Sequence, residues 1–168
     1  MTSTDLLLDA FERIRDAVHP AVNGLSPDQL AFRVDDQSNS IAWLVWHLTR
    51  IQDHHVAGLD GSAQVWDSGR WAEKFALPLD STDTGYGHGP EDVAAVRAEA
   101  PLLLGYFEDV HEKTVQFVAT LAEGDLDRVV DRSWDPPVTV SIRLVSVIAD
   151  DLQHVGQAAY VRGIVQQR

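Results

Sequence analysis

The 168-residue chain carries 26 acidic and 13 basic residues, and its formal charge of -13 would repel a phosphate backbone and excludes DNA or RNA as a partner. It contains no cysteine, which excludes disulfides, cysteine nucleophiles and thiolate ligands, so any metal must be held by His, Asp or Glu. Length and composition predict one domain over residues 1–168, and the N-terminal segment resembles neither a signal peptide nor a membrane span, so we expect a cytoplasmic protein without membrane contact.

The first third of the chain predicts two helices. Apolar residues at helical spacing favour an amphipathic helix over residues 4–23, with Ser3 or Thr4 as its N-cap. The SPDQ sequence at residues 26–29 is typical of a short capped turn, and a polar connection follows it. Ser40 then begins a second helix, which we expect to extend over residues 40–58.

Residues 59–90 form a long connection that is rich in Gly, Asp, Ser, Thr and Pro and is interrupted by aromatic residues. Connections of this length are uncommon within a compact domain and often serve as lids or binding loops. Two interpretations are equally supported. The segment either folds over a ligand or is a crossover that its aromatic side chains pin to the domain.

The last half of the chain predicts two more helices. One is expected over residues 90–122, with Pro101 either kinking it or dividing it into two helices. Valines on both sides of the WDPP sequence at residues 134–137 favour a short strand pair or an extended arm within residues 126–140. A final helix begins at Ser141. The sequence therefore predicts an all-α fold, a four-helix bundle with one long crossover that is either antiparallel or up-down-down-up.

Two of these helices place histidines among apolar residues, about a hundred positions apart in the sequence. Asp150 precedes His154 by four residues, so one helical turn brings both onto one face with Cβ atoms roughly 5–6 Å apart. A lone histidine such as His47 is more often a core residue, but the matching pair on the last helix favours a buried metal site between helices. Asp151 points about 100° away from Asp150 and is expected to be solvated.

Three stretches carry a family resemblance: SIAWLVWHL at residues 40–48, GRW at 69–71 and HVGQ at 154–157. In this order they resemble the DinB-like superfamily over nearly the whole chain. More narrowly, they are similar to the branch related to mycothiol-dependent enzymes and to actinobacterial proteins of unknown function. The resemblance implies a DinB-like four-helix bundle that forms a homodimer and holds a divalent cation, often zinc or nickel, between three ligands.

By position, the resemblance implies that His47, Asp150 and His154 are the metal ligands. Asp150 stands where this branch carries a histidine, and two histidines with one carboxylate leave coordination positions open for water or substrate. The carboxylate could also shift the preference toward iron or manganese, weaken binding or abolish it. The activity that the branch implies is transfer of a low-molecular-weight thiol of the mycothiol type to an electrophilic small molecule, or a related isomerisation or hydrolysis.

Other polar residues are weaker candidates. His54 lies two helical turns beyond His47, too far to bind the same ion, but it could act as a catalytic acid or base. Asp53 could orient an imidazole, although a surface position is favoured for both residues, and Gln157 could either contact the site or pack. An apolar pocket could be lined by Trp46, Trp66, Trp71 and Tyr86, although aromatic residues in a bundle are usually core. No role is assigned to His19, His88 or His111.

A non-catalytic protein is the competing hypothesis. In that case the bundle keeps its shape around a vestigial or structural metal site and binds a protein partner or a second copy. A structural site is closed by a fourth side chain, whereas a catalytic site keeps an open coordination position in a pocket. A role in DNA damage, which the name of the superfamily suggests, conflicts with the acidic charge.

Overall fold

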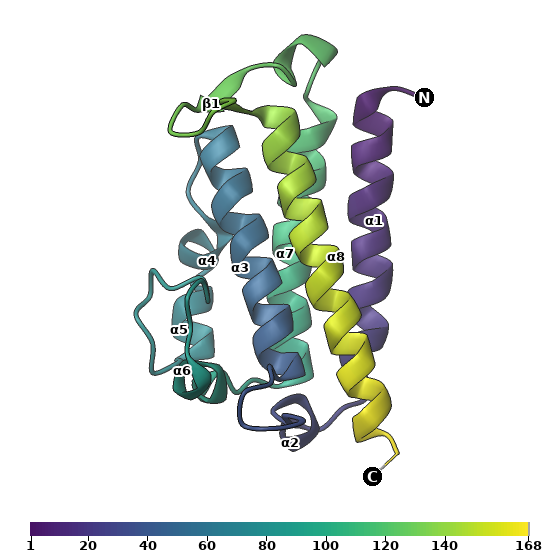
Figure 1. Ribbon diagram of the computed structural model, residues 1–168, viewed down its shortest axis with the longest axis vertical. Coiled ribbons are helices and arrows are strands. Elements are labelled where there is room, and N and C mark those ends of the chain that lie inside the picture. Colours follow the sequence, from purple (N-terminus) through teal and green to yellow (C-terminus); the bar gives the residue numbers. More distant parts are fainter. Residues whose placement is uncertain (168) are drawn as a thin grey trace.

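The computed structural model describes residues 1–167 and contains the four long helices of a bundle: α1 (Ser3–Val22), α3 (Ile41–Asp60), α7 (Ala100–Ala119) and α8 (Val140–Val165). Figure 1 shows α1 and α8 running in one direction, and α3 and α7 in the other. Both α1 and α3 pack against α7 and α8, so α1 and α3 lie on one diagonal of the bundle. The predicted four-helix bundle is confirmed, in its up-down-down-up form.

The core consists of apolar side chains from all four helices. At most 1% of the surface is exposed for Phe11 and Ile14 of α1, Leu48 of α3, Phe107 of α7 and Leu144 of α8. Removal of this apolar surface from water supplies the main driving force for folding, and it fixes which face of each helix points inward. The polar side chains discussed below therefore occupy positions that the packing of the helices has already set.

Side-chain caps define where the helices begin. Thr2 caps α1 in place of the predicted Ser3 or Thr4, and it exchanges hydrogen bonds with Asp5 in a capping box. Ser40 caps α3 as predicted, because its Oγ accepts a hydrogen bond of 3.1 Å from the Trp43 amide. Thr139 caps α8, which begins one residue before the predicted start.

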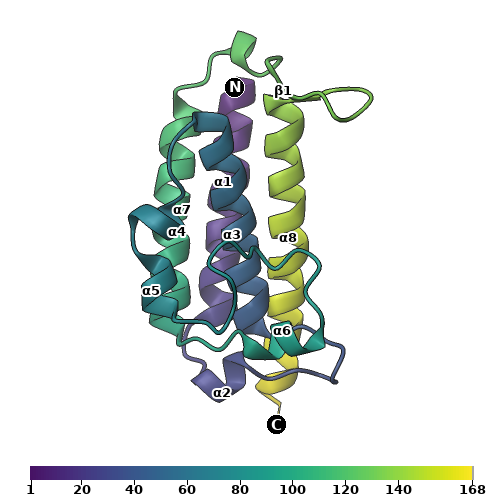
Figure 2. The ribbon, with the colours of Figure 1, turned by 90° about the vertical axis from the view of Figure 1, so that its left-hand side faces the viewer.

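The long connection is a structured crossover with three short helices: α4 (Val65–Ser68), α5 (Trp71–Phe75) and α6 (Pro90–Ala95). Figure 2 shows it on the outside of the bundle, in front of α3. Another short helix, α2 (Pro27–Leu30), precedes α3. The helix predicted over residues 90–122 is divided, with α6 ending at Ala95 and α7 beginning at Ala100. Pro101 lies in the first turn of α7, where the missing amide hydrogen is not needed.

The predicted strand pair is also present. A 3₁₀ helix (Glu123–Asp125) leads into β1 (Val129–Asp131), which pairs antiparallel with β2 (Val138–Thr139) at one end of the bundle. Val129 lies opposite Thr139, and β2 leads directly into α8. Among residues 1–167, no helix is both long and apolar enough to cross a membrane.

Candidate metal centre

The three predicted ligands meet where α3 lies against α8. His47 comes from the middle of α3, and Asp150 and His154 come from consecutive turns of α8. One ligand atom of each residue lies within 4.8 Å of the corresponding atoms of the other two. The His154 Nε2 atom is 3.5 Å from Asp150 Oδ1, and the two imidazole ring centroids are 4.8 Å apart. The structure thus brings together all three residues that the sequence pattern singled out.

The imidazole of His47 is held in a defined orientation. Its Nδ1 atom lies 2.5 Å from the backbone carbonyl oxygen of Thr84, in the crossover. A carbonyl oxygen can only accept a hydrogen bond, so Nδ1 carries the hydrogen and a neutral ring keeps its lone pair on Nε2. The indole of Trp43 stacks on the ring, with centroids 4.6 Å apart and planes inclined by 15°. The site therefore offers His47 Nε2 as a ligand atom.

His154 is held in the same manner by a side chain of its own helix. The His154 Nδ1 atom lies 3.2 Å from the Oε1 atom of Gln157, which accepts its hydrogen bond. The predicted contact of Gln157 with the site is therefore present in the structure. Outer hydrogen bonds of this kind fix the tautomer of histidine ligands in metalloproteins. Both imidazoles of the site are anchored through Nδ1, so Nε2 is the atom that each can offer to a cation; in His154 this atom faces Asp150.

The carboxylate of Asp150 has an unused oxygen. Its Oδ2 atom is buried and accepts no hydrogen bond from the residues that the structure describes. A buried carboxylate oxygen without a partner is costly, and a cation beside it would remove that cost. Among residues 1–167 the group contains three ligands and no fourth His, Asp or Glu. The donor set therefore fits a divalent cation with an open coordination position.

The charge states of the three residues also suit a cation. Burial lowers the pKa of His47, which keeps its ring neutral near pH 7. Burial would also lower the pKa of His154, but its hydrogen bonds with Asp150 and Gln157 outweigh burial and raise it. For Asp150, burial would raise the pKa, but the hydrogen bond with His154 and the nearby imidazoles lower it, so the carboxylate is ionised. His154 is the ligand that protons compete for most strongly.

The centre is accessible from one side. His47 is buried, with 6% of its surface exposed, whereas the side chains of His154 and Asp150 are 18% and 35% exposed. Trp43 closes the other side, since it stacks on His47 and meets the His154 ring edge-on at 6.1 Å between centroids. A small molecule could therefore approach along α8, while the α3 side is closed to water.

The structure does not bring His54 into this group. His54 is exposed, and its Nδ1 atom lies 3.5 Å from Gln64 Nε2, toward the crossover. The neighbouring His55 is the residue with an electrostatic link to the centre. Burial, together with the positive charges of Arg143 and His54, lowers the pKa of His55 to about 4 in spite of the negative charge of Asp150. The side chain of His55 is therefore neutral at physiological pH.

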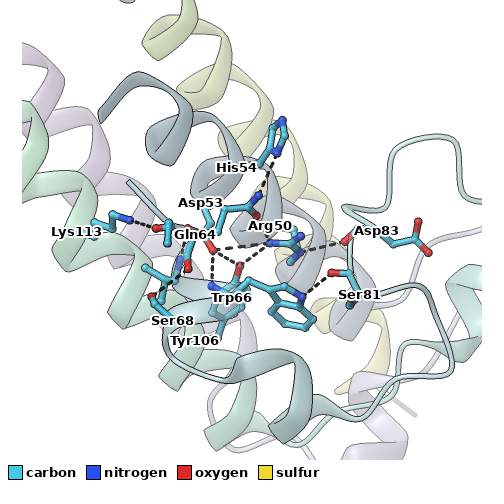
Figure 3. A network of polar contacts seen from close by, with 12 residues as sticks. Arg50, Asp53, His54, Gln64, Trp66, Ser68, Ser81, Asp83, Tyr106 and Lys113 are labelled. Carbon is cyan, nitrogen blue, oxygen red and sulfur yellow. Dashed lines mark hydrogen bonds and ion pairs between the residues drawn. The ribbon is translucent and has the colours of Figure 1, made fainter. Parts of the chain in front are cut away.

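Asp53 does not orient an imidazole, and it is not at the surface. Its carboxylate is 1% exposed and accepts hydrogen bonds of 2.8 Å from the amides of Val65 and Trp66, at the start of α4, and from the Tyr106 hydroxyl. Arg50 lies 3.8 Å from the same carboxylate and is equally buried. Figure 3 shows this network between α3, α7 and the crossover. Asp53 is buried because the crossover covers this side of α3.

The same network fixes the segment that carries Thr84. The Arg50 Nε atom donates a hydrogen bond of 3.1 Å to the Asp83 carbonyl, and the indole of Trp66 donates one of 2.9 Å to the Ser81 carbonyl (Figure 3). The guanidinium of Arg50 also lies 4.7 Å from the centre of the Trp66 ring. The carbonyl that anchors His47 thus belongs to a backbone segment that is held at two positions just before it.

The predicted aromatic pocket is only partly right. Tyr86 is 90% exposed, so its side chain is not part of a buried apolar pocket. Trp71 is buried, and its indole donates a hydrogen bond to Asp109 on α7. Trp46 and Trp66 border a cavity of about 240 Å³ beneath the crossover. These tryptophans pin the crossover to the bundle, so the second of the two interpretations of residues 59–90 describes their role.

The expectation that Asp151 is solvated is wrong. Its side chain is completely buried, and neither carboxylate oxygen has a hydrogen-bond partner within residues 1–167. Burial, and to a smaller degree the charge of Asp150, raises its pKa well above the ordinary value, which favours the neutral form. The reason is topological: α8 packs against both α1 and α3, so the helix flank next to Asp150 faces the core of the bundle.

Sequence reasoning missed several residues around the centre. Trp43 precedes His47 by one helical turn, and this spacing could have identified it as a neighbour. His88 was assigned no role, but its Nδ1 atom accepts a hydrogen bond of 3.2 Å from the Trp43 indole. Thr84 and Gly85 could not be found, since they act through the backbone. At Gly85, where φ is +92°, a Cβ atom would lie 2.5 Å from His47 Nδ1.

Comparison with known proteins agrees with this architecture. A family model described as mycothiol-S-transferase matches residues 6–167. Among solved structures, a conserved protein from Enterococcus faecalis is 32% identical, with a TM-score of 0.93; the match covers 100% of this chain and 99% of that chain. No curated protein matches the sequence. The overall fold of this chain therefore recurs over its full length in a solved structure.

Proposed function

Because the chain belongs to the mycothiol S-transferase family, a DinB-like family, we propose that His47, Asp150 and His154 hold a divalent cation that serves a thiol transfer reaction. The substrates are a low-molecular-weight thiol of the mycothiol type and an electrophilic small molecule. One observation carries the proposal: two imidazoles fixed through Nδ1 and a carboxylate with an unused oxygen lie within 4.8 Å of one another. Zinc or nickel is expected from the family resemblance, and the carboxylate ligand also admits iron or manganese.

The reaction forms a carbon–sulfur bond between the thiol and the electrophile. A divalent cation held by His47, Asp150 and His154 would lower the pKa of a thiol beside it, so that a thiolate would be available at neutral pH. The sulfur lone pair forms the new bond, the leaving group departs with the electrons of the broken bond, and the thiol proton is released to water. Thr84 and Gln157 hold the imidazoles in position, and Trp43 excludes water from the α3 side.

The metal site can be tested by elemental analysis of untagged protein. We expect about one equivalent of a divalent metal in the wild type and its loss in His47→Ala and His154→Ala. His54→Ala is the matched control, because it removes an exposed histidine from the same helix as His47. Circular dichroism checks that the helices persist in every variant. Retention of stoichiometric metal by either ligand variant contradicts the assigned site.

The transfer reaction needs a separate assay. The metal-loaded protein is mixed with mycothiol and a chromogenic aryl halide, and product formation is followed with and without a chelator. We expect turnover that disappears with the chelator and in His154→Ala. A protein that binds metal stoichiometrically but forms no product with mycothiol or other small thiols would support the non-catalytic metal-binding bundle instead.

A further inference from the structure

His88 lies in the crossover just before α6, and its imidazole is buried between two tryptophans of α3. Only 7% of its side chain is exposed, and its ring stacks on that of Trp46, with centroids 5.8 Å apart and planes inclined by 19°. Its Nδ1 atom accepts a hydrogen bond of 3.2 Å from the indole of Trp43, and its Nε2 atom lies 3.7 Å from Asp83 Oδ2. An indole nitrogen can only donate, so in a neutral ring Nδ1 carries the lone pair and Nε2 the hydrogen.

Trp43 is in contact with both imidazoles of the candidate metal centre. It stacks on His47, with ring centroids 4.6 Å apart, and meets His154 edge-on at 6.1 Å between centroids. Stacking fixes the separation of two flat rings but resists sliding within the plane only weakly, whereas a hydrogen bond has a preferred direction. The one N–H group of the Trp43 indole bonds to His88. His88 therefore determines where the indole lies against the two imidazoles.

The contacts of Thr84 and His88 with α3 share one spacing. The Thr84 carbonyl oxygen lies 2.5 Å from His47 Nδ1, and His88 Nδ1 lies 3.2 Å from Trp43 Nε1. Thr84 and His88 are four residues apart in the crossover, and their partners are four residues, or about one turn, apart on α3. A backbone hydrogen bond of 3.2 Å from the His88 amide to the Gly85 carbonyl closes the segment into a turn. One turn of the crossover therefore contacts one turn of α3 at two positions.

We propose that His88 is a positioning residue of the candidate metal centre, because it holds the Trp43 indole in place and thereby sets the imidazoles of His47 and His154 for binding one cation. The inference rests on the proposed function, since it concerns the ligands of the cation proposed there. His88 is not itself a ligand, because Trp43 occupies the lone pair of its Nδ1 atom and Nε2 carries the hydrogen.

The competing explanation is that His88 only fills the space between two tryptophans. Leucine and asparagine have nearly the same shape, but asparagine carries an acceptor oxygen, Oδ1, at the same number of bonds from the backbone as Nδ1 of histidine. His88→Asn can therefore keep the hydrogen bond from Trp43, whereas His88→Leu removes it. If His88 only fills space, both variants bind metal equally well.

His111 offers a matched control for the loss of a buried histidine. Its side chain is also 7% exposed, and its ring also stacks on an aromatic ring, that of Phe107. It lies on α7, and its Nε2 atom is 3.2 Å from Glu12 Oε1 on α1, so its polar contact joins the other two helices of the bundle. His111→Leu should therefore lower stability without changing the metal centre.

The first measurement is the ¹H–¹⁵N NMR spectrum of the metal-free protein, in which each tryptophan gives one indole N–H signal. We expect the Trp43 signal to lie at the low field of a hydrogen-bonded group in the wild type and in His88→Asn, and to move upfield in His88→Leu. The signals of Trp66 and Trp71, whose indoles bond to other groups, should stay in place. A Trp43 signal that does not change in His88→Leu would overturn the proposal.

The second measurement is zinc affinity, by competition with a chromophoric chelator. We expect His88→Leu to lose about tenfold, and His88→Asn and His111→Leu to change the affinity by less than about threefold, since disturbing an outer partner of a ligand usually costs about 10–100-fold. The absorption bands of the cobalt-loaded protein, which report the ligand geometry, should shift in His88→Leu alone. Across the variants, a loss of affinity without a change in the Trp43 signal, or a change in that signal without a loss, would overturn the role of His88.

This proposal and the proposed function fail in different ways. If the metal site is wrong, the wild type binds no zinc, and the ring signals of His47 and His154 in the metal-free protein decide the role of His88. They should then move in His88→Leu but not in His111→Leu, and unchanged ring signals would overturn that role. If the metal site is right but His88 has no part in it, the wild type binds one equivalent of zinc, and His88→Leu binds it as tightly as His111→Leu does.

Discussion

Replacement of Gly85 by alanine should weaken metal binding through His47 without touching a ligand. Gly85 has a φ of +92°, and an added Cβ atom would lie 2.5 Å from His47 Nδ1 and 3.1 Å from its Cγ. The imidazole cannot simply move away, because it lies between the stacked Trp43 and the Thr84 carbonyl. Either the ring turns or the segment carrying Thr84 shifts, and both changes disturb the hydrogen bond that fixes the tautomer.

Gly87→Ala separates this effect from backbone strain. Gly87 also has a positive φ, +77°, but its Cβ atom would meet nothing within 4 Å. Both variants should lose about 1–2 kcal/mol of stability from the left-handed backbone conformation. Only Gly85→Ala should lose metal affinity in addition, by about 10–100-fold, as is usual when an outer partner of a histidine ligand is disturbed.

Affinity is measured by competition with a chromophoric chelator, and stability by thermal denaturation of the metal-free proteins. Metal added at a fixed concentration should raise the Tm of Gly87→Ala more than that of Gly85→Ala, because stabilisation by a ligand follows its affinity. Equal metal affinities of the two variants would refute the view that the Thr84 carbonyl positions His47.

Two further predictions follow from the ionisable groups. Metal affinity should fall as the pH drops from about 8 to 5, because protons compete with the metal for Nε2 of His154, whose pKa is raised above 6.5. Calorimetric titrations at several pH values measure this affinity. An affinity that does not change with pH would contradict the prediction. Asp151→Asn should stabilise the protein at pH 8 but hardly at pH 4, as measured by urea denaturation. The Asp151 pKa is raised in the folded state, so only the unfolded chain ionises as the pH rises, and wild-type stability falls by about 1.4 kcal/mol per unit within that window. Parallel stability profiles of the two proteins would exclude this explanation.

Helical spacing predicted the bundle and the shared face of Asp150 and His154, whereas the assignment of all three candidate ligands, His47 among them, came from the family resemblance. Apolar periodicity located the four long helices, and the separation of Asp150 and His154 by one turn located their shared face. The same spacing was insufficient for Asp151. A helical pattern gives the angle between the side chains of Asp150 and Asp151. Whether the Asp151 side chain then points to solvent or to the core depends on which helices pack against that face of α8. That information comes from the topology, in which α8 contacts both α1 and α3.

The contacts made by the crossover were beyond sequence reasoning for a different reason. The Thr84 carbonyl, which fixes His47, is a backbone group that any residue could supply at that position. Its location depends on Arg50 and Asp53, two charged residues that the helical pattern gives no reason to bury. Their hydrogen-bond partners include backbone amides and a carbonyl of the crossover, which lie near these side chains only once the crossover has folded.

The buried pair of Arg50 and Asp53 is better understood as an anchor than as a source of stability. Desolvation of both charges opposes their attraction, so a buried ion pair often contributes little net free energy compared with apolar residues of similar size. In this protein the pair forms hydrogen bonds with the backbone of the crossover. Asp53 accepts from the amides that begin α4, and Arg50 donates to the Asp83 carbonyl, next to Thr84. An apolar pair could fill the same volume but would leave this backbone unanchored. The network therefore ties the position of a candidate metal ligand to the folding of the crossover.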